Sequence, residues 1–228
     1  MGTLKIASYN VHRAIGNDRR SDPQRILAVL REIDADVIAL QEVEAHDEGS
    51  DMLAWLAGQL GFHAIAGTTL LRHDGHYGNG LLTRLPVMGK QFCDLTWRGR
   101  EPRGAIAVDI DCEGPGLRVV ATHLGLRPAE RRDQVQQLLN LFKEHSQERS
   151  VLIGDLNEWF LWGRPLRRLH RHFEATPSLA TFPARLPVLA LDRIWTHPRS
   201  MLRALQVHKT PLARAASDHL PLVATLDL

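Results

Sequence analysis

The chain has 228 residues, of which 44% are hydrophobic and 24% charged, an ordinary globular composition that excludes a disordered, collagen-like or coiled-coil protein. The formal net charge of +2 does not demand a polyanionic partner. The two cysteines provide no disulfide framework, and no apolar run approaches the roughly 20 residues that span a bilayer. The N-terminus lacks the features of a signal peptide, so we expect a cytoplasmic protein with a single domain over residues 1–228.

The first part of the chain alternates predicted strands and helices. Residues 4–9 are predicted to form a strand. A helix is expected over 22–33, where Asp22 suits the N-cap and Pro23 the first turn. The wholly apolar residues 37–40 are typical of a strand that is buried on both faces. A second helix is expected over 50–60, with Gly61 just beyond its end.

The remainder of the chain is richer in strands. Strands are predicted over 80–83, 87–92, 105–110, 117–122, 151–154, 189–196, 202–209 and 220–226, with helices over 128–145 and 164–173. Because strands dominate and helices fill the long connections, the pattern favours an α/β protein in which sheets pack on each other with helices outside.

Polar side chains stand at the borders of these apolar strands. They occur in six clusters: Tyr9-Asn10, Gln41-Glu42, Thr122-His123, Gly154-Asp155-Leu156-Asn157, Asp192 after its apolar run, and Ser217-Asp218-His219. Because strand ends converge on one edge of a sheet, we expect these groups to meet in one cleft. Carboxylate and amide oxygens suit a hard cation such as Mg²⁺ or Mn²⁺, and histidines beside carboxylates suit proton transfer or phosphate contact.

These clusters resemble the motifs of the endonuclease/exonuclease/phosphatase superfamily, which includes DNase I, exonuclease-III-type AP endonucleases, neutral sphingomyelinases and inositol polyphosphate 5-phosphatases. Gly-Asp-Leu-Asn at 154–157 and Ser-Asp-His-Leu-Pro at 217–221 are the most specific of them, and the motifs span residues 8–221 in the order of the family. The resemblance implies a DNase I-like four-layer α/β sandwich, with two face-to-face β-sheets flanked by helices.

The resemblance also implies roles for individual residues. Glu42 would be the main metal ligand, with Asn10 beside it and Asp218 as a further carboxylate. Asp155 would orient and deprotonate the attacking water, and Asn157 would hold a phosphoryl oxygen. His219 would bind the phosphate with Asp192 fixing its tautomer, and His123 would contact the phosphate and assist the leaving oxygen. Whether Asp155 or a histidine is the base stays open.

Three further residues are predicted to bind the substrate. Asn79 lies in a Gly-Asn-Gly stretch that resembles sphingomyelinase-like members, Arg103 precedes a strand, and His12 follows Asn10 by two positions. For Asn79 the alternative is a turn residue, and for Arg103 an exposed ion pair. The cations over 164–172 either contact phosphate or form a solvated helix face, and Trp159 and Trp162 form either a substrate wall or part of the core.

Together these features predict an Mg²⁺- or Mn²⁺-dependent phosphoesterase with a phosphodiester or phosphomonoester substrate, and foremost a phosphodiesterase that hydrolyses a lipid or small-molecule phosphodiester. A DNA or RNA nuclease of the same superfamily is the alternative, disfavoured by the low net charge and few aromatic residues. The third alternative is an inactive binding member, which the intact motifs argue against. We expect a monomer, and peripheral membrane contact is compatible with this prediction.

Overall fold

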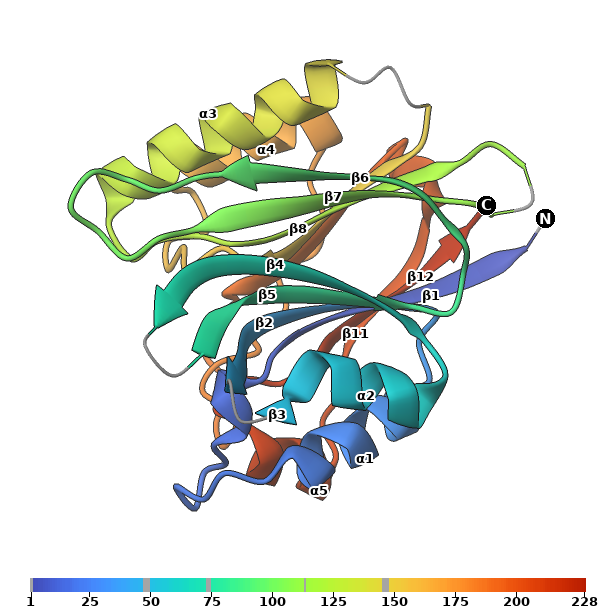
Figure 1. Cartoon of the computed structure of the whole chain (residues 1–228). Helices are drawn as coiled ribbons and strands as arrows, with labels where there is room; N and C mark the ends of the chain where they lie inside the picture. Colours follow the sequence, from blue (N-terminus) through green and yellow to red (C-terminus); the bar gives the residue numbers. More distant parts are fainter. Residues whose placement is uncertain (1, 47–49, 73–74, 113, 145–147) are drawn as a thin grey trace.

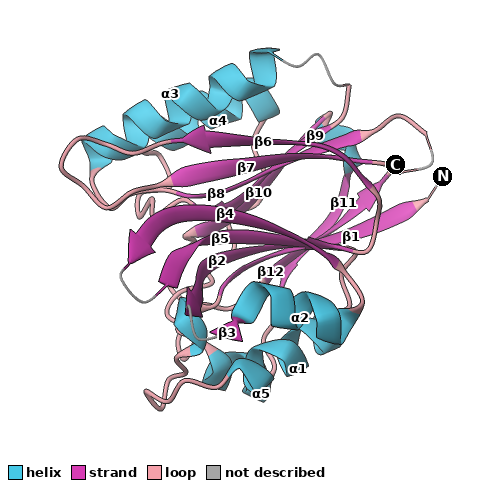
Figure 2. Cartoon of the chain, in the orientation of Figure 1, coloured by secondary structure: helices cyan, strands magenta, loops and turns pink. Residues whose placement is uncertain are grey.

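The computed structural model describes residues 2–46, 50–72, 75–112, 114–144 and 148–228, and its strands form two sheets stacked face to face (Figures 1 and 2). The first sheet has the strand order β11-β12-β1-β2-β5-β4, with the short β3 paired to β2. Strands β1 and β2 are parallel, and the other pairs are antiparallel. The strands are β1 (Thr3–Asn10), β2 (Val37–His46), β3 (Ser50–Asp51), β4 (His63–Arg72), β5 (Gly75–Thr83), β11 (Leu202–Val207) and β12 (Leu222–Asp227).

The second sheet is built from the middle of the chain, in the strand order β10-β9-β8-β7-β6. Only β8 and β9 are parallel among its described pairs. Its strands are β6 (Val87–Asp94), β7 (Gly104–Ile110), β8 (Leu117–His123), β9 (Ser150–Asp155) and β10 (Asp192–His197).

Helices cover the outer face of each sheet (Figure 1). The first sheet is covered by α1 (Pro23–Ile33), α2 (Met52–Leu60) and α5 (Pro211–Ala216), and the second by α3 (Pro128–Glu144) and α4 (Arg164–Phe173). Two 3₁₀ turns, η1 (His12–Ala14) and η2 (Arg199–Met201), complete the elements. This arrangement confirms the four-layer α/β sandwich.

Three layers of buried apolar side chains hold the four layers together. The central core fills the space between the sheets and includes Ile6, Ile106 and Ile153. One outer core lies under α1, α2 and α5, and the other under α3 and α4. The cores explain why 37–40 and 151–154 are apolar at every position, since both sheets are covered on both faces.

Local sequence signals place the first two helices as predicted. The Asp22 carboxylate accepts a hydrogen bond from the backbone N–H of Gln24 and caps α1. The Asp51 carboxylate accepts one from Ala54 and caps α2, and Gly61 ends that helix at φ 71°. Because Asp51 is the N-cap, α2 begins at Met52, two residues later than the prediction.

Other predicted boundaries are wrong. Strand β4 and helix α5 were not predicted, and β5 begins at Gly75 rather than at residue 80. Strand β10 begins at Asp192, because residues 189–191 belong to the preceding loop. Within the described residues, no helix is long and apolar enough to cross a membrane.

Candidate active site

The end of β9 brings three polar side chains together. In the second sheet Asp155 lies in register with His123 of β8 on one side and with Asp192 of β10 on the other. Asp155 and Asp192 are 1% and 0% exposed, and His123 is 3% exposed. The strand pairing alone therefore places two carboxylates and an imidazole side by side at one edge of this sheet.

A β-bulge in the first sheet supplies Glu42. The β2–β5 register shifts between Leu40 and Val43, so that Gln41 and Glu42 together oppose Asn79. Glu42 has φ 58°, a left-handed conformation that a residue with a long side chain seldom adopts. A bulge interrupts the alternation of side chains along a strand and can re-aim one of them. Here the re-aimed carboxylate lines the cleft.

Asn10, at the end of β1, connects the two sheets across this cleft. Its Nδ2 donates hydrogen bonds to Glu42 Oε1 (3.2 Å) and to Asp155 Oδ2 (3.1 Å). Its Oδ1 accepts one from the backbone N–H of His12 at 3.0 Å. The cleft has a volume of about 320 Å³ and is lined by Asn10, Arg13, Glu42, Tyr77, Glu101, Arg103, His123, Leu126, Asp155, Asn157 and His219.

The turn after β9 fixes the carboxylate of Asp155. Asp155 Oδ1 accepts a hydrogen bond of 2.9 Å from the backbone N–H of Asn157, which adopts φ 51°. Gly154 has φ 147°, and a Cβ at this position would collide with the carbonyl of Thr122. Only glycine fits here, and asparagine tolerates the left-handed conformation better than most residues, which explains the local sequence.

His219 is held by a buried carboxylate. Its Nδ1 lies 2.8 Å from Asp192 Oδ2, and the same oxygen accepts a hydrogen bond of 2.6 Å from the Thr181 hydroxyl. Its Nε2 is 3.7 Å from Asp155 Oδ2. Asp192 thus contacts the ring nitrogen that faces away from Asp155, and the second nitrogen remains on the cleft side.

The two histidines of the cleft have opposite protonation tendencies. For His219, burial favours the neutral ring, but the negative charges of Asp192, Asp155 and Asp218 outweigh it and raise the pKa to about 10. For His123, burial and then the charge of Arg103 lower the pKa to about 3. His219 is therefore an imidazolium at neutral pH, and His123 is a neutral imidazole.

The contacts of His123 agree with its neutral form. Its Nδ1 lies 3.1 Å from Arg103 Nη1, and its Nε2 lies 3.0 Å from Asn157 Nδ2. Both neighbours are N–H donors; a neutral imidazole can accept a hydrogen bond from one of them, whereas a protonated imidazole can accept from neither. Asn157 Nδ2 also donates to the carbonyl of Leu124 at 2.9 Å, so this amide ties the ring to the β8–α3 loop.

Four residues with predicted site roles do not line the cleft. Asp192 lies behind His219, as expected for an orienting group. Asp218 is half-buried, with its carboxylate 3.7 Å from His12 Nδ1, and does not line the cleft. His12 contacts the cleft through its backbone N–H on Asn10. Asn79 donates to the Gly104 carbonyl at 3.0 Å and so joins β5 to β7.

Some residues of the site were not predicted from the sequence. Arg13, Tyr77, Glu101 and Leu126 line the cleft, and Thr181 holds Asp192. Burial, followed by the charge of Glu42, raises the pKa of the Tyr77 hydroxyl, so it stays protonated beside that carboxylate. Tyr77 and Leu126 each lie within three residues of a recognised motif, the signal that could have found them.

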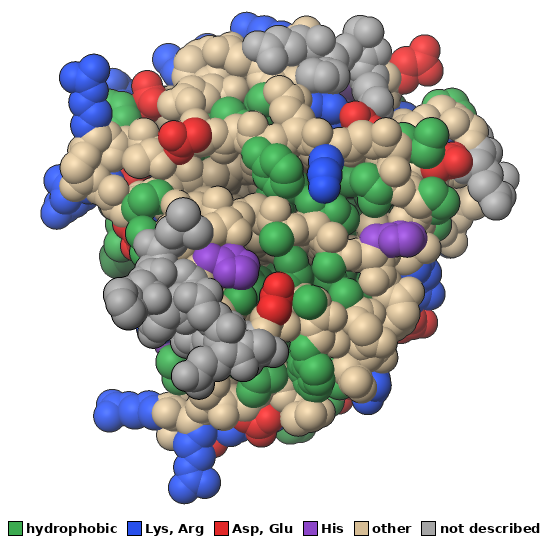
Figure 3. Space-filling model, viewed as in Figure 1, with side chains coloured by type: hydrophobic (Ala, Val, Ile, Leu, Met, Phe, Trp, Pro, Cys, Tyr) green, Lys and Arg blue, Asp and Glu red, His purple; other side chains and the backbone are tan. Residues whose placement is uncertain are grey.

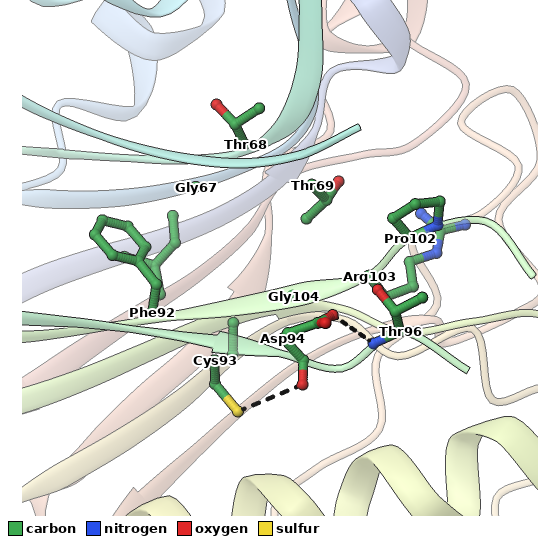
Figure 4. A pocket seen from close by; sticks show the side chains of 12 residues that line it. Gly67, Thr68, Thr69, Phe92, Cys93, Asp94, Thr96, Pro102, Arg103 and Gly104 are labelled. Atoms are coloured by element: carbon green, nitrogen blue, oxygen red, sulfur yellow. Dashed lines mark hydrogen bonds between the residues drawn. The ribbon is translucent and has the colours of Figure 1, made fainter. Parts of the chain in front are cut away.

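A second pocket of about 330 Å³ lies beside the cleft, between β4, β6 and β7 (Figure 4). Thr68 and Thr69 border it from β4, and Asp94 from β6. Arg103 borders both this pocket and the cleft, and its Nη1 also lies 3.5 Å from Glu101 Oε1. The guanidinium therefore contacts both Glu101 and His123. Because Arg103 is buried, the alternative of an exposed ion pair does not describe it.

The donor set of the cleft fits a hard divalent cation. Glu42 and Asp155 offer carboxylate oxygens on either side of a single amide group, and Glu101 adds a third carboxylate nearby. Among the described residues, Asp155, Asp192 and His219 also offer ligand atoms within 4.8 Å of one another. In that group, however, Asp192 and His219 already satisfy each other through a hydrogen bond. The Glu42 side is therefore the better cation site.

Comparisons with known proteins agree with this geometry. The model of the endonuclease/exonuclease/phosphatase family matches residues 7–219. The uncharacterized protein YbhP of Escherichia coli K12 is 28% identical over 249 residues, covering 99% of this chain and 97% of YbhP. A Beutenbergia cavernae member of the family superposes with TM-score 0.80 at 24% identity (100% of this chain, 72% of that one), and a Bacteroides vulgatus member with 0.82 at 18% (100% of both).

Proposed function

Because the chain belongs to the endonuclease/exonuclease/phosphatase family, a family of phosphoesterases, we propose that it is a divalent-metal-dependent phosphodiesterase. One observation carries the proposal: the carboxylates of Glu42 and Asp155, which come from different sheets, share the amide of Asn10 in a cleft that His219 also lines. This combination offers a cation site, a base and a proton donor to one phosphate group.

Glu42 would hold the Mg²⁺ or Mn²⁺ ion, with Asn10 beside it. When bound, such an ion neutralises charge on the phosphoryl oxygens and so favours attack by water. Asp218, predicted as a further metal ligand, does not line the cleft and contacts His12, so it would act on the site through its charge.

Asp155 is suited to orient and deprotonate the attacking water. One carboxylate oxygen is fixed by the backbone N–H of Asn157, and the other faces Asn10 and the Nε2 atoms of His123 and His219. A carboxylate held in this way keeps one orientation throughout the reaction, which lowers the entropic cost of positioning the water.

The pKa directions favour His219 over His123 as the group that donates to phosphate. His219 carries a proton on each nitrogen at neutral pH, and Asp192 holds the ring so that Nε2 faces the cleft. His219 can therefore bind a phosphoryl oxygen or protonate the leaving oxygen. The lowered pKa of His123 makes it a poor acid, so we assign it a positioning role between Arg103 and Asn157.

The cleft favours a single phosphodiester group of a lipid or small molecule over a long polyanion. Its volume of about 320 Å³ is at the small end for ligand sites. The arginines of α4 are exposed, and Arg168 donates to Gln136 of α3, which places this face in the outer helix layer. On the face shown in Figure 3, the described basic and acidic side chains are interspersed rather than gathered into a basic track.

The test is hydrolysis of bis-p-nitrophenyl phosphate with Mg²⁺ or Mn²⁺, with and without EDTA. We expect metal-dependent release of p-nitrophenol that Glu42→Gln abolishes, whereas Asp227→Asn, an exposed carboxylate on β12, serves as the matched control. Metal-independent release, or full activity of Glu42→Gln, would refute the proposal. A panel of phospholipids, plasmid DNA, abasic DNA, RNA and inositol phosphates then separates the lipid or small-molecule assignment from the nuclease.

A further inference from the structure

Four consecutive large apolar side chains are exposed next to the cleft. They lie on the loop between β9 and α4 and begin two residues after Asn157. The exposed fractions are 61% for Trp159, 58% for Phe160, 50% for Leu161 and 71% for Trp162. Single exposed apolar residues are common on protein surfaces, but a contiguous group marks an interaction site. The tryptophans therefore form neither part of the core nor the wall of the cleft.

This loop is held in a defined conformation. The backbone N–H of Phe160 donates to Glu158 Oε1 at 3.2 Å, and that of Gly163 donates to the Phe160 carbonyl at 2.9 Å. Glu158 is 3% exposed and forms an ion pair of 3.2 Å with Arg131. A turn anchored on a buried ion pair presents its apolar side chains to solvent persistently.

The same arginine joins a second exposed apolar residue to this surface. Arg131 Nη1 donates to the carbonyls of Gly125 (3.3 Å) and Leu126 (2.7 Å), while its Nε donates to Glu158. Leu126 is 65% exposed and also lines the cleft. Leu126 and residues 159–162 thus form one surface at the cleft mouth, which we call the apolar rim. It lies at the end of the molecule where α3 begins, on the left in Figure 1.

The exposed charges of the two segments that carry the apolar rim have one sign. Over residues 124–130 and 156–167, the exposed charged side chains are Arg127, Arg164 and Arg167. The two acidic residues of these segments, Glu130 and Glu158, are each 3% exposed, and Glu158 is neutralised by Arg131. A partner of the apolar rim therefore meets these three arginines beside it, and Glu101 only where Leu126 borders the cleft.

We propose that the apolar rim inserts into the interface of an anionic phospholipid bilayer, with the cleft turned toward the membrane. Aromatic side chains prefer the headgroup level of a bilayer, and arginines beside them attract anionic lipids. A protruding turn of four residues also exposes too little surface for a specific protein–protein interface, which buries about 800 Å² on each partner. This docking goes beyond hydrolysis and does not depend on it.

The test is flotation of the protein with phosphatidylcholine vesicles that contain or lack phosphatidylglycerol, with EDTA present so that no hydrolysis occurs. We expect binding to the anionic vesicles, weakened at least about tenfold by the double variant Trp159→Ser/Trp162→Ser. The matched control is Met88→Ser/Phe92→Ser, which removes two side chains that are 73% and 53% exposed on β6. Arg127→Gln/Arg164→Gln should weaken binding mainly at low salt.

Several outcomes would overturn the proposal: no flotation of the wild type, equal flotation of the Trp159→Ser/Trp162→Ser variant, or equal binding to neutral vesicles. The hydrolysis of soluble bis-p-nitrophenyl phosphate, measured in parallel, distinguishes this proposal from the proposed function. Vesicle binding without hydrolysis would refute only the phosphodiesterase, and hydrolysis without vesicle binding would refute only the docking.

Discussion

Replacing Asp192 by asparagine removes the charge that holds His219 protonated while keeping the size of the side chain. Asp192 is fully buried, and its Oδ2 accepts from both His219 and Thr181. Its Oδ1 has no hydrogen-bond partner among the described residues. An asparagine here can present an N–H to His219 Nδ1 and favour the wrong tautomer of the neutral ring.

The magnitude follows from the pKa of His219. A rise from 6.5 to about 10 corresponds to about 5 kcal/mol in favour of the imidazolium, at ~1.4 kcal/mol per pH unit. Three carboxylates raise this pKa, and the charge of Asp192 has the largest effect of the three. Asp192 therefore supplies at least a third of the rise. In Asp192→Asn the pKa of His219 should therefore fall by at least about one pH unit. The rate at neutral pH should fall about 10- to 100-fold, as when an orienting partner of an active-site histidine is lost.

The assay is an NMR titration of ¹⁵N-histidine-labelled protein in EDTA, together with the pH dependence of hydrolysis. In the wild type, activity that needs the imidazolium should persist until the pH approaches 10, and this alkaline limb should shift to lower pH in Asp192→Asn. Thr181→Val is the matched control, because it removes a hydrogen bond from the same oxygen but no charge. An unchanged titration of His219 in Asp192→Asn would refute the reasoning.

Three further predictions concern other parts of the site. Glu42→Gln should weaken Mg²⁺ or Mn²⁺ binding, measured by calorimetry, and leave the thermal unfolding temperature within a few degrees of the wild type. Gly154→Ala should cost more than about 3 kcal/mol in urea unfolding because of its φ of 147° and the Thr122 carbonyl, whereas Gly58→Ala in α2, where the added Cβ meets no atom, should not destabilise. Because the pKa of His123 is lowered to about 3, the unfolded chain gains a proton below pH 6.5 that the folded chain excludes. Through this group the free energy of unfolding is highest above pH 6.5 and falls by about 2 kcal/mol at pH 5. His123→Asn should therefore lose less unfolding free energy than the wild type between pH 7.5 and pH 5, and an equal loss would contradict this.

The sequence predicted the layers of the fold better than its edges. Strands buried on both faces, such as 37–40 and 151–154, stand out as apolar runs. Strand β4 does not, because this edge strand alternates Ile65 and Gly67, which are buried, with exposed Ala64, Ala66 and Thr68. The few large apolar residues of β4 give a weak pattern, and the six-residue helix α5 is too short to show a periodicity.

In the site, motif residues at strand ends could be predicted, and residues supplied by loops could not. Asn10, His123 and Asp155 end strands and Glu42 lies at a bulge, so strand pairing brings them together. Asn157 follows β9 by two residues and His219 precedes β12 by three, which places both at the same cleft. Thr181 lies in a loop with no signature, and its contact with Asp192 exists only after the loop has closed over β10. Likewise, neither the different protonation of the two histidines nor the exposure of Trp159 can be read from residue types, since both depend on burial and neighbouring charge.

The position of β1 between β2 and β12 has a consequence for synthesis on the ribosome. Strand β1 pairs in parallel with β2, but its other edge must wait for β12, at residues 222–227. His219 also arrives only at this late stage. The contiguous second sheet, from β6 to β10, can assemble earlier, whereas the first sheet and the cleft close only after β12 has been synthesised. A nascent chain should therefore be unable to assemble the cleft before β12 has docked on β1.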